Sequence, residues 1–266
     1  FTELFIPAGN AAEAALVWLM HKSINATIVW ICEGRYSLEL MHRDMRTLYP
    51  NQSNALLFYP PSETGSHGED DPDIAGQRLD VLVKLGKSQH PIAPPPSHPV
   101  IATSIQALMQ KSATPEELAR ETIVLNVGRE YDIEDLAGLL GRAGYAFNPE
   151  VQEKCKVSLK GGLLDVWPPT ETWPARIEFC GSTIESIRTF DPANQRSTGK
   201  TDYIIIPPAV DTHARKGGHG LLSHLPAGTV FIWSDQETIK EHAALYEEAA
   251  GESHAADLII PFEKIE

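Results

Sequence analysis

Cysteine and long apolar runs are scarce in this sequence. Its three cysteines, Cys32, Cys155 and Cys180, lie far apart and form no C-x-x-C pair, which argues against a zinc ribbon or a disulfide framework. We expect free thiols in a reducing compartment, and therefore a cytoplasmic protein. No run of about 18 apolar residues occurs, so the sequence predicts no membrane-spanning helix. Phe1 opens the sequence without an initiator methionine or a signal-peptide pattern, so we expect a piece of a longer protein.

Positive charge is also scarce. Lys and Arg total 22 against 36 Asp and Glu, for a formal net charge of −14 at pH 7. A protein that binds duplex DNA usually carries an excess of basic residues, and anionic lipids repel an acidic surface. We therefore expect weak or no DNA binding and no membrane partner. The hydrophobic fraction of 42% is that of an ordinary globular protein.

No known nucleotide-binding or catalytic motif is present. A phosphate-binding loop needs G-x-x-x-x-G-K-[ST] after the first strand, because its backbone N–H groups cradle the phosphates and its Lys reaches the outer phosphates. Residues 4–13 offer Gly9 as the one glycine, no Lys-Ser or Lys-Thr pair, and Glu13, which would repel phosphate. We therefore expect no ATP hydrolysis by this region.

Other candidate sites are better explained as surface loops. Residues 216–220 contain a Gly-Gly pair and resemble a phosphate loop, but no strand directly precedes them. The three histidines between positions 213 and 224 have no zinc-binding spacing, and the acidic run at 69–73 lacks the spacing of a calcium loop. We expect no catalytic residue, no cofactor and no metal ion. A divergent ATPase that binds nucleotide near Gly9 is the alternative.

The first 115 residues alternate helix and strand signals. Helical apolar periodicity or buried-strand runs occur at 11–22, 27–32, 34–48, 55–59, 73–85, 100–102 and 104–110. This alternation predicts a parallel sheet covered by helices. The same pattern resumes after residue 209, with a strand at 229–233 and a helix that opens on a capping box from Ser234 to Glu237.

Residues 116–208 follow a different pattern. A strand at 122–127 precedes a helix that Asp132 caps and Gly144 ends. Short strands and turns follow, and the Gly-Ser pair at Gly181 marks a hairpin. We therefore predict an α/β fold in which a parallel-sheet domain is split by an inserted α+β domain with an antiparallel sheet. The predicted domains are 1–115 and 209–266 for the first and 116–208 for the second.

Three arginines, Arg176, Arg188 and Arg196, fall within 21 residues of the inserted region. Arginine is enriched at protein interfaces, because its planar fork binds carboxylates through two hydrogen bonds. The alternative is that the first two arginines pair internally with Glu178 and Glu185 on a solvated sheet face. Composition does not decide between these interpretations.

Strand alternation predicts the direction of several of these side chains. In residues 174–180 the apolar side chains share one face, which leaves Arg176 and Glu178 on the other. Ile184 and Ile187 have opposite parity, so either a β-bulge lies between them or one of them is exposed. If the bulge is present, Arg188 emerges on the solvent side.

An ordered series of segments in this region resembles the module shared by the bacterial transcription-repair coupling factors and the excision nuclease subunit UvrB. The most similar runs are KGGLLDVWP at 160–168, PARIEF at 174–179 and IESIRTFDP at 184–192. Further similar segments lie at 101–110, 127–132, 143–145 and 195–197. Three features favour the coupling factors over UvrB. They are the missing phosphate loop, the short loop at 59–73 and the sequence QALMQ at 106–110. Lys160, Cys180, Ser182 and Thr183 depart from the family pattern.

The resemblance implies a UvrA-binding domain inserted in an α/β domain with a degenerate P-loop. It implies a non-catalytic region that recruits UvrA to a stalled RNA polymerase in nucleotide excision repair, within a parent protein that is an ATP-dependent DNA translocase. The other implied partner is the remainder of the parent protein, which would mask the same surface. The implied partner-binding residues are Arg176, Glu178, Arg188, Phe190 and Arg196, with Phe190 as an apolar anchor. The alternatives are a UvrB-like fragment with residual nucleotide binding and a purely autoinhibitory structural domain.

Overall fold

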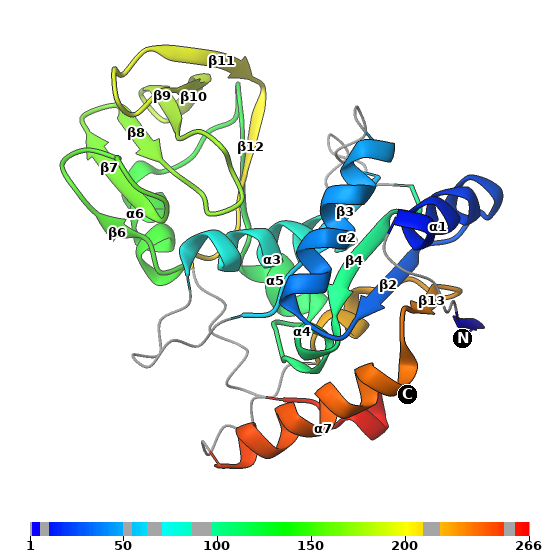
Figure 1. Cartoon of the computed structure of the whole chain (residues 1–266). Coiled ribbons are helices and arrows are strands. Elements are labelled where there is room, and N and C mark those ends of the chain that lie inside the picture. The colour runs from blue at the N-terminus through cyan, green and yellow to red at the C-terminus, as the bar shows by residue number, and fades with distance from the viewer. Residues whose placement is uncertain are drawn as a thin grey trace. The chain divides into compact units, whose positions relative to one another are not determined.

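The computed structural model describes residues 2–5, 11–49, 55–62, 71–86, 97–209, 219–252 and 259–265. The chain divides into two compact units, whose elements Figure 1 labels. Unit 1 comprises Phe1–Pro115 and Thr212–Glu266, and unit 2 comprises Glu116–Asp211. Two segments that are distant in sequence therefore build unit 1, and the intervening segment builds unit 2.

Unit 1 contains a five-stranded sheet in the order β1-β13-β2-β4-β3, in which all neighbouring strands run parallel. The strands are β1 (Thr2–Phe5), β2 (Ile28–Cys32), β3 (Leu56–Tyr59), β4 (Val100–Ser104) and β13 (Val230–Trp233). Every residue of β2 and β4 is buried, as expected of strands that have neighbours on both edges and cover on both faces. The predicted parallel sheet is thus confirmed.

Helices connect the strands of unit 1. They are α1 (Ala11–Ser23), α2 (Arg35–Leu48), α3 (Pro72–Leu85), α4 (Ile105–Met109) and α7 (Gln236–Glu252), with 3-10 turns η2 (Leu221–His224) and η4 (Phe262–Lys264). The chain passes through α2 from β2 outward to β3, and through α3 from β3 back to β4. Because such crossovers are right-handed, two connections in opposite directions place α2 and α3 on opposite faces of the sheet.

The beginning of α7 differs from its predicted cap. Asp235, not Ser234, accepts the hydrogen bond from the Thr238 backbone N–H, at 3.1 Å. The Ser234 hydroxyl accepts instead from the Trp30 indole N–H, at 2.8 Å. The predicted capping box was therefore displaced by one residue, because the buried indole of Trp30 requires a hydrogen-bond acceptor and Ser234 supplies it.

Unit 2 combines two helices with two antiparallel ladders. Its elements are α5 (Pro115–Glu121), β5 (Ile123–Asn126), α6 (Ile133–Arg142), β6 (Ala146–Phe147), β7 (Lys156–Lys160), β8 (Leu163–Val166), β9 (Ala175–Cys180), β10 (Thr183–Phe190), β11 (Ser197–Thr201) and β12 (Tyr203–Ile206). Six strands form a sheet in the order β11-β10-β9-β8-β7-β6, and β12 pairs with β5 separately. Only β6 and β7 pair in parallel within this sheet. The predicted antiparallel sheet is confirmed.

One face of the six-stranded sheet packs on α6. Asp132 caps this helix, as predicted, by accepting from the N–H groups of Glu134 and Asp135 at 2.9 and 3.0 Å. Leu136 and Leu140 of the helix are buried in one cluster with inward side chains of the strands. The opposite face of β8, β9 and β10 is therefore the outward face of unit 2.

The hairpin of β9 and β10 has the predicted geometry. Gly181 opens its two-residue turn with φ 64°, a conformation that glycine adopts without strain. The pairing shifts between Ile184 and Ser186, and both Ile184 and Ile187 are buried. The bulge alternative is thus confirmed, and Arg188 lies directly opposite Arg176.

Several sequence predictions fall outside the described residues. They concern the missing phosphate loop at Gly9, the Gly217-Gly218 pair and His213. Within the described ranges, no helix combines the length and the apolar character needed to cross a bilayer. The same ranges contain no group of three or more side chains suited to hold a metal ion.

Candidate protein interface

Four charged side chains form a row across the outward face of unit 2. The register places Asp165 of β8 opposite Arg176 of β9, Arg176 opposite Arg188 of β10, and Arg188 opposite Lys200 of β11. Residues directly opposite one another in a sheet project from the same face, so the four side chains are neighbours. We call Asp165, Arg176, Arg188 and Lys200 the arginine row. Sequence reasoning did not single out Asp165 or Lys200, because the strand order determines their positions.

Arg176 is held by a bidentate ion pair. Its Nε donates to Oδ1 of Asp165 at 2.8 Å, and its Nη2 donates to Oδ2 at 2.7 Å. The same Nη2 also donates to Oε1 of Gln195 at 2.9 Å. The hydrogen bonds to Asp165 raise the pKa of the Arg176 guanidinium, which therefore stays charged at all physiological pH values. The side chain of Arg176 is 27% exposed, so it still reaches solvent although the ion pair fixes its orientation.

Phe190 lies beneath this guanidinium. The Cζ atom of Arg176 lies over the Phe190 ring, 4.6 Å from its centroid, at a distance suited to a cation–π contact. Phe190 is only 1% exposed. The expectation that Phe190 presents an apolar anchor is therefore corrected. The ring supports Arg176 from below in this structure and does not reach solvent.

Glu178 of β9 is the ion-pair partner of Arg188. One carboxylate oxygen accepts from Nη2 of Arg188, and the other accepts from the Ser186 hydroxyl at 2.5 Å. The hydrogen bond from Ser186, followed by that from Arg188, lowers the pKa of Glu178 below its usual range. Both arginines thus pair internally, but the partners differ from those the sequence suggested: Asp165 pairs with Arg176, Glu178 pairs with Arg188, and no ion pair of Glu185 with a described residue is present.

The ion pair with Glu178 uses only part of the hydrogen-bonding capacity of Arg188. Its side chain is 40% exposed, while its Nε atom is buried and has no hydrogen-bond partner among the described residues. A buried N–H without a partner costs about 1–3 kcal/mol. An external acceptor can reach the exposed part of the Arg188 side chain but not its buried Nε.

Arg196 projects from the turn between β10 and β11. The turn is held by Asp191, whose carboxylate accepts from the Ala193 N–H at 2.9 Å and from the Asn194 side chain at 2.7 Å. Asn194 in turn accepts from the Arg196 N–H at 2.9 Å. The Arg196 side chain is exposed and makes no ion pair with any residue that the structure describes. The turn thus presents a free cation beside the arginine row.

These side chains are suited to bind a partner protein through charge-assisted hydrogen bonds. Half-buried, oriented guanidinium groups and exposed cations lie together on one face of a protein whose net charge is −14. Such a face is complementary to carboxylates or other polar acceptors on a partner protein.

Comparison with known proteins identifies the region. Residues 123–211 match the UvrB interaction domain. The chain is 30% identical over 206 residues to the transcription-repair-coupling factor of Myxococcus xanthus, covering 75% of this chain and 17% of that protein. It is 27% identical over 210 residues to that of Bacillus subtilis, covering 78% and 17% respectively. It is 32% identical over 109 residues to the UvrABC system protein B of Thermosipho africanus, covering 41% and 16%.

The matched part of the chain therefore spans about a sixth of the length of these curated relatives. The family match coincides with β5 to β12 and includes Asp165, Arg176, Glu178, Arg188 and Arg196. The chain thus contains a UvrB interaction domain and resembles a part of the transcription-repair-coupling factors.

Proposed function

We propose that this chain is a non-catalytic docking region of a transcription-repair coupling factor, and that it binds UvrA through the outward face of unit 2. In the parent protein it would recruit UvrA to a stalled RNA polymerase during nucleotide excision repair. The observation that carries the proposal is the arginine row, which lies within the residues that match the UvrB interaction domain. Arg176, Glu178, Arg188 and Arg196 are the proposed contact residues, and Phe190 is the proposed support of Arg176.

The hydrogen-bonding capacity of the arginines supports this proposal. Arg176 uses Nε and Nη2 internally, and no bond of its Nη1 to a described residue is present. Arg188 uses Nη2 alone. Arginine carries five N–H donors, so each side chain can hold its internal carboxylate and still donate to a partner. The internal ion pairs orient the guanidinium groups before binding, which lowers the entropic cost of docking.

Binding of the whole chain to purified UvrA tests the proposal. We expect Arg188→Ala and Arg196→Ala each to weaken binding by about tenfold or more, equal to about 1.4 kcal/mol. Arg142→Ala is the matched control, because Arg142 is an exposed arginine on α6, which packs on the opposite face of the sheet. Circular dichroism and melting curves establish that each variant is folded.

Arg196→Ala is the most informative variant, because its side chain makes no ion pair with the described residues and its loss leaves the fold intact. Unchanged UvrA binding by folded Arg188→Ala and Arg196→Ala variants would overturn the assignment of this face. Equal weakening by Arg142→Ala would show that the effect is one of net charge and not of position.

A further inference from the structure

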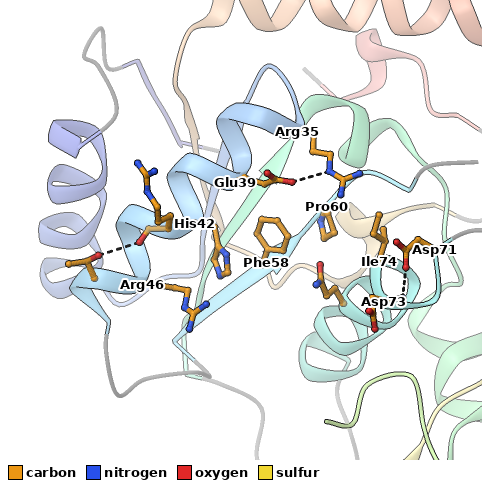
Figure 2. Close-up of a pocket in the computed structure, with 12 residues that line it drawn as sticks. Arg35, Glu39, His42, Arg46, Phe58, Pro60, Asp71, Asp73 and Ile74 are labelled. Atoms are coloured by element: carbon orange, nitrogen blue, oxygen red, sulfur yellow. Dashed lines mark hydrogen bonds and ion pairs between the residues drawn. The ribbon is translucent and has the colours of Figure 1, made fainter. Parts of the chain in front are cut away.

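A groove of about 640 Å³ lies beside β3, the last strand in the order of the unit 1 sheet (Figure 2). One wall is the length of α2, the floor is β3 with Phe58 and Pro60, and the other wall is the beginning of α3. All three elements belong to unit 1. The groove is therefore separate from the arginine row.

The backbone of β3 offers hydrogen-bonding groups to this groove. The Val100 N–H of β4 donates to the Ala55 carbonyl at 2.9 Å. In a parallel ladder, alternate residues direct both backbone groups to the same neighbour, so Leu57 and Tyr59 face β4. The N–H and C=O of Phe58 consequently point away from β4, along the open edge of the described sheet. Such an edge is a template for an additional strand.

The two walls of the groove lie on opposite faces of the sheet. His42 of α2 stacks on the Phe58 ring, with centroids 4.4 Å apart. Arg78 of α3 lies over the ring of Tyr59, 4.2 Å from its centroid, on the other face. Side chains of a strand alternate between the faces of its sheet. A strand laid beside β3 would therefore direct alternate side chains to α2 and to α3.

The walls differ in charge. The α2 wall contributes Arg35, Arg43 and Arg46, of which Arg35 pairs with Glu39 at 3.1 Å and Arg43 pairs with Asp44 at 3.2 Å. Arg46 is exposed and makes no ion pair within the part of the chain that the structure describes. At the beginning of α3 the lining contributes Asp71 and Asp73, and one carboxylate oxygen of Asp71 accepts from the Asp73 backbone N–H at 2.9 Å. Figure 2 shows Arg46 on one side of Phe58 and Asp71 and Asp73 on the other, with the Arg35–Glu39 ion pair on α2.

We propose that the groove binds an extended peptide segment of another protein, in which acidic residues alternate with basic ones, as an additional strand beside β3. The acidic side chains face the arginines of α2, and the basic side chains face Asp71 and Asp73. The backbone of the peptide pairs with the N–H and C=O of Phe58. The acidic α3 wall disfavours a nucleic acid or a polyphosphate, because it repels phosphate groups.

The probe is a fluorescein-labelled peptide in which eight residues alternate between Glu and Lys, titrated with the whole chain. Its control is a peptide of the same composition with all Glu residues before all Lys residues. We expect the alternating peptide to bind at least about tenfold more tightly, because only alternation satisfies both walls. Equal binding of the two peptides would overturn the proposal.

N-methylation tests the backbone pairing without any change in the protein. Two versions of the peptide carry N-methyl groups on the odd or on the even residues. Only alternate N–H groups of an added strand point to β3, so one version should lose binding and the other should keep it. Equal effects of both versions would contradict strand addition.

Arg46→Glu should weaken the alternating peptide at least about tenfold, whereas Arg142→Glu, an exposed arginine outside the groove, should not. Both positions are exposed, so the fold is expected to survive both changes. Pyrophosphate and a single-stranded oligodeoxynucleotide are titrated in parallel. If either binds in an Arg46-dependent manner while the alternating peptide does not bind, the groove is an anion site and the proposal is wrong.

Discussion

Phe190 and Arg176 differ in exposure from what their residue types suggest, because the aromatic ring is buried and the charged side chain covers it. An aromatic residue between arginines on an outward face is the expected apolar anchor of an interface. In the structure, the guanidinium of Arg176 lies over the Phe190 ring, and the ring is 1% exposed. The guanidinium of Arg176 is therefore the part of this pair that reaches solvent, and the buried ring supports it.

Replacement of Phe190 tests this role. We expect Phe190→Ala to lower the free energy of unfolding by about 3–5 kcal/mol, because it removes a buried aromatic ring and leaves a cavity. Phe147→Ala in the same unit is the matched control, since Phe147 is 50% exposed and should cost far less. Urea unfolding followed by tryptophan fluorescence measures both. Similar stability losses would show that Phe190 is not buried in solution.

At the level of elements, short-range hydrogen bonds determine where helices and turns begin. Asp132 accepts from two backbone N–H groups at the first turn of α6. Asp235 caps α7 by accepting from the Thr238 backbone N–H. Ser234 does not cap this helix, because its hydroxyl accepts from the Trp30 indole N–H. A cap is therefore predictable from sequence when no tertiary contact competes for its side chain.

The α6 cap can be tested by a pair of substitutions. Asp132→Ala should lower the free energy of unfolding of unit 2 by about 1 kcal/mol, because two N–H groups of the first turn lose their acceptor. Asp132→Asn keeps an acceptor oxygen and should lose much less. Chemical denaturation monitored by circular dichroism distinguishes the two outcomes. An equal loss for Asn and Ala would mean that the charge, and not the cap, stabilises the helix.

At the scale of the whole molecule, acidic residues outnumber basic ones, and two histidines, His21 and His42, are partly buried against aromatic rings. Burial lowers the pKa of His21, whose Nδ1 is hydrogen-bonded with the Tyr49 hydroxyl and whose Nε2–H donates to the His98 carbonyl at 2.7 Å. Burial, assisted by Arg46, lowers the pKa of His42, which stacks on Phe58. Both histidines are therefore neutral in the folded protein at pH 7.

These lowered pKa values predict a stability that falls with acidification. Below about pH 6.5 the unfolded chain takes up protons that folded His21 and His42 do not, so the free energy of unfolding decreases as the pH falls. Urea titrations between about pH 7 and about pH 5.5 should show this slope. His42→Asn should reduce it, because one of the two histidines with a lowered pKa is removed. A slope unchanged by His42→Asn would contradict the assignment.

The faces of individual strands were predictable because side-chain direction in a strand is a local property. Ile177 is buried and Arg176 points outward, as alternation requires, and the opposite parity of Ile184 and Ile187 indicated a bulge that the structure contains. The assignment of the partner-binding residues stays a prediction, which the UvrA-binding experiment tests.

The sequence by itself determined the alternating helices and strands of unit 1, the hairpin at Gly181 and the lack of a phosphate-binding motif, because each depends on residues close together in the chain. Only the tertiary structure decided that Asp165 holds Arg176, that Phe190 is covered and that β3 lies at a sheet edge beside two walls of opposite charge. These features depend on strand order and register, which join residues that are distant in the chain and which local patterns do not encode.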